Sequence, residues 1–184
     1  IDVPSDISSA TFFLVAAAIC PDSDLVIEHV GMNPTRIGVV NILRLMGADL
    51  SIDNECEVGG EPVADLHIKY APLKGIHVPE DQVPLAIDEF PALMVAASCA
   101  TGTTTITGAE ELRVKESDRI QAMVDGLSAM GVTIEGTDDG AIIQGMGANS
   151  QFGPAQIVTH HDHRIAMAFT IAGLRAGADI KILD

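Results

Sequence analysis

Apolar helical runs alternate with short segments rich in β-formers, and this order repeats along the chain. Three stretches begin with an aspartate, continue through an alanine-rich apolar run and a turn, and end in residues typical of strands. These stretches are residues 6–30, 88–107 and 162–183. The apolar runs show no polar face, which is typical of helices that are buried on all sides. Helices inside and sheets outside would invert the usual α/β layering.

A second pattern recurs between these stretches. Residues 33–52 and 115–134 each predict a helix, a stop at the glycine after Met46 or Met130, and a strand. Two more strand-like runs follow each copy, and residues 55–62 and 149–154 are rich in turn formers and predict loops. The unit is therefore helix, strand, helix, strand, strand, strand. Its third copy holds only the first helix and strand, which predicts a truncated unit. The final strand-like runs are residues 65–70, 75–78, 141–144 and 156–159.

The composition narrows the possible functions. The 184 residues fit one domain and include 10 basic and 26 acidic side chains, for a net charge of −16. This balance excludes nucleic acid and an anionic membrane as the main partner, since both require a basic face. No apolar run reaches the roughly 18 residues that span a bilayer, and no basic leader segment is visible. Three widely spaced cysteines fit a reducing compartment without a metal knuckle.

The few cations stand near predicted helix starts. Arg36 follows Asn33, a predicted N-cap, and Arg119 and Arg164 lie just inside the next two helices of this kind. An arginine in the first turn of a helix opposes the helix dipole, at a cost of about 0.3–1 kcal/mol. Three such placements favour an anion site for phosphates and carboxylates, assembled by the pseudo-threefold repeat. The alternative is that each arginine pairs with an acid nearby.

Three further residues, Asp88, Lys115 and Glu116, are candidates for acid–base chemistry. Lys115 and Glu116 are adjacent and precede the Arg119 helix. They are either a solvated ion pair or a carboxylate for acid–base catalysis whose pKa is tuned by the neighbouring ammonium group. Asp88 is an N-cap of the second apolar helix, a carboxylate that accepts a proton from an alcohol, or both. The run from His160 to His163 does not predict a metal site, because consecutive side chains do not converge on one ion.

These residues lie in strings that closely resemble the C-terminal half of the 5-enolpyruvylshikimate-3-phosphate synthase family. The strings follow the family's order and cover nearly the whole chain. The resemblance implies an inside-out α/β barrel of βαβαββ units, with buried helices and outer sheets. It also implies that residues 1–184 form one domain, the C-terminal domain of a two-domain enzyme, without the N-terminal domain and the extreme C-terminus. The strings are SDISSATFFLVAAA, GMNPTRIG, IDEFPALMVAA, ELRVKESDR and HDHRIAMAF.

The resemblance also implies an activity. Members of the family are transferases that move the enolpyruvyl group of phosphoenolpyruvate to the 5-hydroxyl of shikimate 3-phosphate and release phosphate, a step toward chorismate and the aromatic amino acids. The expected partners are these two small molecules and the N-terminal domain, with neither nucleic acid nor membrane. No metal or organic cofactor is expected. The expected location is cytoplasmic, of bacterial type, with a plastid left open. This chain alone should be inactive.

The family's functional residues are carried over where the strings match. By resemblance, Asp88 binds and deprotonates the 5-hydroxyl, and Lys115 binds shikimate 3-phosphate and assists proton transfer. Glu116 resembles the group that protonates the methylene of phosphoenolpyruvate and later takes a proton back. The residues that resemble the phosphoenolpyruvate-binding set are Arg119, His163 and Arg164.

We therefore expect these six residues on one exposed concave face, with cations that have few protein partners. Two other functions stay open at this point. One is an anion-binding or interaction domain that keeps the architecture without catalysis. The other is the related enolpyruvyl transfer to a nucleotide sugar, UDP-N-acetylglucosamine. The presence of an acid, a base and cations together favours enolpyruvyl transfer to shikimate 3-phosphate over these two alternatives.

Overall fold

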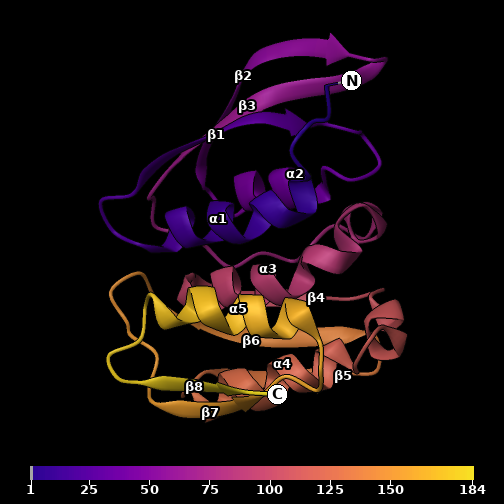
Figure 1. The fold of residues 1–184 in the computed structure, drawn as a ribbon. Coiled ribbons are helices and arrows are strands. Elements are labelled where there is room, and N and C mark those ends of the chain that lie inside the picture. Colours follow the sequence, from indigo (N-terminus) through magenta and orange to yellow (C-terminus); the bar gives the residue numbers. More distant parts are fainter. Residues whose placement is uncertain (1) are drawn as a thin grey trace.

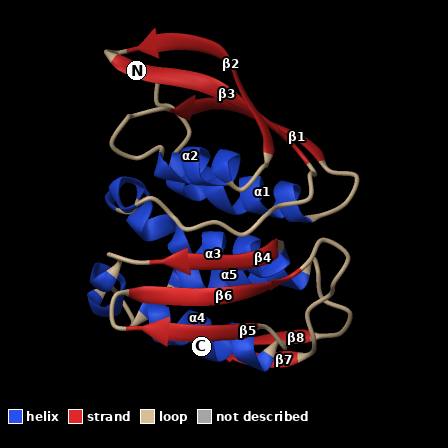
Figure 2. Ribbon diagram, turned by 180° about the vertical axis from the view of Figure 1, so that it is seen from behind, coloured by secondary structure: helices blue, strands red, loops and turns tan. Residues whose placement is uncertain are grey.

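Three small β-sheets surround a core of helices in the computed structural model, which describes residues 2–184 (Figures 1 and 2). The helices are α1 (Ile7–Ile19), α2 (Gly38–Leu45), α3 (Phe90–Cys99), α4 (Arg119–Ala129) and α5 (His163–Gly173). Three 3₁₀ turns lie at η1 (Glu80–Gln82), η2 (Pro84–Glu89) and η3 (Glu110–Val114). The strands are β1 (Asp24–Gly31), β2 (Asp49–Val58), β3 (Glu61–Lys69), β4 (Thr101–Ile106), β5 (Thr133–Thr137), β6 (Gly140–Met146), β7 (Ala155–Val158) and β8 (Ile180–Leu183).

The sheets follow the sequence repeat. Two antiparallel sheets have the strand orders β1-β3-β2 and β4-β6-β5, and a third holds β7 beside β8 in parallel. Isolated parallel bridges join Ser5 to Val30 and Lys74 to Thr101, so the segments before α1 and α3 also run parallel to the strands after them. Each unit therefore opens with a short strand-like segment, and the predicted βαβαββ order is confirmed.

The structure corrects three details of the predicted elements. Neither 75–78 nor 156–159 closes its unit: residues 75–78 form bridges to β4 and open the second unit, and residues 156–158 lie in β7, which pairs in parallel with β8 and opens the third. Residues 55–62 are not a loop but the end of a β2–β3 hairpin, because Gly59 and Gly60 adopt the positive φ angles that a tight turn requires. The helix expected at Asn33 begins at Gly38 instead, because the Asn33 side chain accepts a hydrogen bond from the Thr35 amide and forms a turn.

The apolar helices are buried, as their sequences predict. All ten residues of α3 are buried, and α1 and α5 pack against it in the interior (Figure 1). The three helices run in the same direction, so their N-termini lie at one end of the molecule. No helix within residues 2–184 has the length and apolar character needed to cross a bilayer.

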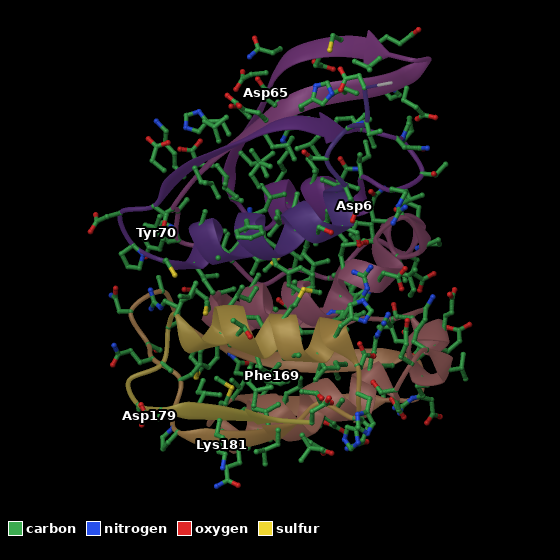
Figure 3. All side chains as sticks on the ribbon, viewed as in Figure 1. Asp6, Asp65, Tyr70, Phe169, Asp179 and Lys181 are labelled. Carbon is green, nitrogen blue, oxygen red and sulfur yellow. The ribbon has the colours of Figure 1, made fainter. Side chains whose placement is uncertain are left out.

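A glycine brings α4 against α5. A Cβ atom on Gly126 would lie 2.1 Å from the ring of Phe169, a contact that no larger residue can make without displacing α5. Phe169 is fully buried and points into the interior from α5 (Figure 3). This close approach sets the N-terminus of α4 beside that of α5, which places their first-turn residues within contact distance.

Candidate active site

The candidate site forms where the buried helices begin. Asp6 caps α1, Asp118 caps α4 and Asp162 caps α5, each through a side-chain oxygen that accepts a backbone N–H bond. Figure 3 shows Asp6 at this end of α1 and Tyr70 near the opposite end. The concentration of helix N-termini gives this end of the core a positive backbone potential.

Arg119 is the centre of the site. Its side chain is only 1% exposed and contacts three carboxylates. Nε donates to Asp162 at 2.8 Å, Nη1 donates to Asp88 at 3.0 Å, and Nη2 donates to Glu116. The planar guanidinium with its fork of donors suits this role, because a lysine ammonium could not reach three acids in different directions. The fold thereby joins residues from η2, α4 and the start of α5.

Asp88 connects Arg119 to Lys115. The Lys115 ammonium lies 3.4 Å from the same Asp88 oxygen that accepts from Arg119. Burial tends to raise the pKa of Asp88, but the charges of Lys115 and the two nearby arginines outweigh it and hold this pKa below its usual value. A hydrogen bond to Glu111, together with the charge of Asp88, raises the pKa of Lys115. Both groups are therefore ionised at neutral pH.

Asp162 fixes the relative positions of α4 and α5. Its side chain is fully buried, accepts from the Ser117 hydroxyl at 3.0 Å, and caps the Arg164 amide at 2.9 Å. Burial tends to raise the pKa of Asp162, but the hydrogen bond and charge of Arg119 outweigh it, so the pKa lies below its usual value. An ionised carboxylate is stable here because every oxygen has donors.

Arg164 approaches the same centre from α5. Its Nη1 donates to the Asp88 backbone carbonyl at 3.1 Å and lies 3.7 Å from a Glu89 carboxylate oxygen. Asp88 thus contacts one arginine through its side chain and the other through its backbone. The side chain of Arg164 is 15% exposed, so its guanidinium retains access to solvent.

The two remaining predicted residues, Glu116 and His163, are exposed at the surface of the site. Glu116 contacts Arg119 with a side chain that is 54% exposed, and it borders a hollow of about 300 Å³ shared with Gln121 and His160. His163 is exposed on the first turn of α5, and its side chain makes no hydrogen bond or ion pair within residues 2–184. Five of the six predicted residues are thus linked by direct contacts, and His163 stands beside them.

The exposure expected for the cations is wrong. Arg119 is buried and bonded to three acids, and Lys115 and Arg164 each have acidic partners as well. Arginines at helix N-termini are unfavourable alone, so the chain surrounds them with carboxylates. Arg36 does not join them, because it precedes α2 in a turn and lies half-exposed, 4.0 Å from Asp6. Asp88 is not an N-cap, since it belongs to η2, before α3 begins.

Sequence reasoning missed several residues that support the site. Glu89 contacts Arg164, and Ser117 donates to Asp162. Each is a polar residue that directly follows a predicted site residue in the sequence, and this position is the signal that could have identified it. Arg113 donates to the Asp138 and Thr137 carbonyls and to Asp118. It therefore anchors the loop that carries Lys115 and Glu116.

No group of three or more His, Cys, Asp or Glu side chains in residues 2–184 is arranged to hold a metal ion. In the histidine run, His160 and His161 both adopt positive φ angles, and His161 pairs with Asp184 at 3.1 Å. His160 and His161 therefore form a tight turn that places Asp162 at the N-cap of α5.

Comparison with known proteins identifies the family. The family model described as EPSP synthase (3-phosphoshikimate 1-carboxyvinyltransferase) matches residues 1–184. The 3-phosphoshikimate 1-carboxyvinyltransferase of Hydrogenovibrio crunogenus is 62% identical over the whole chain, which spans 41% of that relative's length. The relatives compared are thus more than twice as long as this chain.

Solved structures support the same family assignment. EPSP synthase from Acinetobacter baumannii superposes with a TM-score of 0.97 and 61% identity over 99% of this chain and 42% of that one. The enolpyruvyl transferase NikO from Streptomyces tendae shares only 16% identity, with a TM-score of 0.69 over the full chain and 39% of NikO, and shows the common fold. The inside-out α/β architecture that the resemblance implied is confirmed, and the chain belongs to the EPSP synthase family.

Proposed function

We propose that residues 1–184 are the C-terminal domain of a two-domain transferase. It moves the enolpyruvyl group of phosphoenolpyruvate to the 5-hydroxyl of shikimate 3-phosphate and releases phosphate, in the cytoplasm. The observation that carries this proposal is the direct contact of Arg119 with both Asp88 and Glu116, two carboxylates of different exposure. Simple anion binding needs cations but does not need two carboxylates beside them.

The environments of the two carboxylates suit different tasks. Asp88 is held ionised by Lys115 and the arginines, so it can orient the 5-hydroxyl and accept its proton as the oxygen attacks C2 of phosphoenolpyruvate. Glu116 is open to solvent and can donate a proton to the methylene carbon. Loss of phosphate then restores the double bond as Glu116 takes back a proton from the new methyl group. No cofactor or metal is needed, because proton transfer and charge stabilisation suffice.

The cations supply that charge stabilisation. In the proposal, Lys115 binds shikimate 3-phosphate, and Arg119, His163 and Arg164 bind phosphoenolpyruvate. Helix N-termini beside these side chains add backbone donors for phosphate and carboxylate oxygens. Local cations are essential, because the net charge of −16 repels anionic substrates at a distance. The N-terminal domain of the same enzyme completes the cleft.

Ligand binding and turnover by the full-length enzyme test this proposal. Shikimate 3-phosphate should raise its melting temperature, whereas UDP-N-acetylglucosamine should not, and phosphate release should require both proposed substrates. Residues 1–184 alone should show no turnover, because catalysis by proximity requires both halves of the cleft. Stabilisation by the nucleotide sugar alone would favour the related transferase. Anion binding without phosphate release would favour a non-catalytic domain.

A further inference from the structure

Glu89 is a buried acid directly behind the candidate site. Its side chain is 6% exposed, and burial raises the pKa of its carboxyl group. A buried carboxylate is costly unless it has partners. Glu89 has no role in the proton transfers proposed above, and its side chain is buried beneath the surface of the site. Its partners therefore indicate what it does.

Those partners join two helices that lie far apart in the sequence. The Ser8 hydroxyl, in the first turn of α1, donates to Oε1 of Glu89. The same oxygen lies 3.7 Å from Nη1 of Arg164, in the first turn of α5. Ser8 is itself buried and fixes the orientation of this carboxylate. Oε1 is thus a fixed negative point at the junction of α1, α3 and α5.

Arg164 depends on this fixed point. Glu89 is the one acid within 4.0 Å of its guanidinium in residues 2–184, and its other bond goes to the neutral Asp88 carbonyl. The Arg164 side chain is long and starts at a helix N-terminus, where the dipole repels its charge. Without a partner, the guanidinium would leave the cleft for solvent and lose its direction.

We infer that Glu89 is a positioning residue that holds the Arg164 guanidinium toward the phosphoenolpyruvate subsite, and that Ser8 keeps Glu89 in place. This inference rests on the proposed function, in which Arg164 binds phosphoenolpyruvate. We expect the effect on phosphoenolpyruvate alone, because the Glu89 side chain pairs with neither Lys115 nor the Asp88 carboxylate, the groups that the proposal assigns to shikimate 3-phosphate.

Steady-state kinetics of the full-length enzyme test the inference. Glu89→Ala should raise the KM for phosphoenolpyruvate by at least ~10-fold, since misplacement of a binding group by about 1 Å can cost up to ~10²-fold. The KM for shikimate 3-phosphate should stay within about 2-fold. Glu89→Gln should recover part of the loss, because its amide oxygen can still accept from Ser8 but carries no charge toward Arg164. Ser8→Ala should raise the same KM by a smaller factor.

Two controls separate positioning from general damage. Glu57→Ala removes an exposed acid on β2 and should leave both KM values unchanged. In an Arg164→Ala background, Glu89→Ala should add no further increase, because the group that it positions is gone. Should Glu89→Ala fold poorly, Ser8→Ala carries the same test through a smaller rise in the phosphoenolpyruvate KM alone.

The inference is overturned if Glu89→Ala leaves the phosphoenolpyruvate KM unchanged, raises both KM values equally, or adds its full effect without Arg164. It is also overturned if Glu89→Gln is as damaging as Glu89→Ala. These outcomes all require a wild-type enzyme that turns over. Absence of turnover in the wild type would instead defeat the proposed function.

Discussion

Two buried arginines at opposite ends of the core have different kinds of partners. Arg119, among the helix N-termini, contacts three carboxylates. Arg175, where the helices end, donates to the Ile19, Ala148 and Ser150 carbonyls at 2.7–2.9 Å. Carbonyls at a helix C-terminus favour a cation, whereas N–H groups at an N-terminus oppose one. Arg175 is thus stabilised by backbone carbonyls that are part of the fold. Arg119 is stabilised by the carboxylates of acidic side chains.

This difference fits a structural role for Arg175 and the binding role proposed for Arg119. The partners of Arg175 are neutral main-chain atoms that cannot move without unfolding a loop. The partners of Arg119 include two partly exposed side chains, Asp88 and Glu116, which are freer to move than backbone carbonyls. Burial and a full set of hydrogen bonds therefore do not by themselves mark an arginine as structural; the nature of its partners does.

The largest expected effect comes from removing each arginine in the full-length enzyme. Arg119→Ala should lower the free energy of unfolding by about 3–5 kcal/mol, because the buried Asp162 carboxylate loses its counter-charge. Arg175→Ala should cost only about 1–3 kcal/mol, because it leaves neutral carbonyls unsatisfied. Urea unfolding of both variants measures the difference. A larger loss of unfolding free energy for Arg175→Ala than for Arg119→Ala would contradict this distinction between the two arginines.

A smaller but more specific effect follows at the cleft. Glu116→Gln keeps the size of the side chain but removes the proposed proton donor, so kcat should fall at least ~10²-fold, the range for a lost general acid or base. The KM values should change less. Glu135→Gln, an exposed acid on β5, serves as the matched control and should keep wild-type kcat. Near-normal kcat for Glu116→Gln would make Glu116 a surface acid only.

The smallest effect is a dependence of stability on acid pH that involves the carboxylates around Arg119 but not Arg175. Asp88 and Asp162 have lowered pKa values in the folded state, so the folded protein binds fewer protons than the unfolded chain. Their contribution is complete above the ordinary aspartate pKa of about 3.9 and is lost as the pH falls through the lowered values. Asp162→Asn should therefore flatten the decline of Tm below about pH 4.

Arg175→Ala should leave that acid decline unchanged, because no carboxylate contacts Arg175 in residues 2–184. Glu89 acts in the opposite direction: its raised pKa favours the folded state at low pH and loses that effect as the pH rises. Between its ordinary pKa of about 4.3 and its raised folded value, Glu89 makes stability rise as the pH falls, so Glu89→Gln should remove that rise and leave the decline below about pH 4 unchanged. Equal slopes for wild type and Asp162→Asn would show that these pKa shifts do not contribute.

The sequence predicted those features of the site that depend on local pattern. Asp118 and Asp162 precede apolar helices at cap positions, so the places of Arg119 and Arg164 followed directly. Asp88 was predicted as a cap because a helix does follow it, but η2 intervenes and α3 begins two residues later. Local spacing cannot distinguish a 3₁₀ turn from the first turn of an α-helix.

The contacts that make the site a network could not be predicted in this way. Ser8 and Glu89 are 81 positions apart, and Arg164 and the Asp88 carbonyl are 76 apart. Such pairs meet only because α1, α3 and α5 pack in parallel, which is a property of the assembled fold. The expectation of exposed cations, drawn from the absent second domain, is wrong for the same reason, because tertiary packing supplies Lys115, Arg119 and Arg164 with acids.

The parallel bridges around α1 and α3 also bear on how the chain acquires its structure during synthesis. Every β-sheet pairs segments from one stretch of sequence, as in β1 to β3 or β4 to β6, so hydrogen bonding between strands never waits for a distant part of the chain. A ribosome that adds about 5–20 residues per second can release these sheets one after another. Only the apolar helices must find partners across repeats, so we expect helix docking, and with it the candidate site, to follow sheet formation.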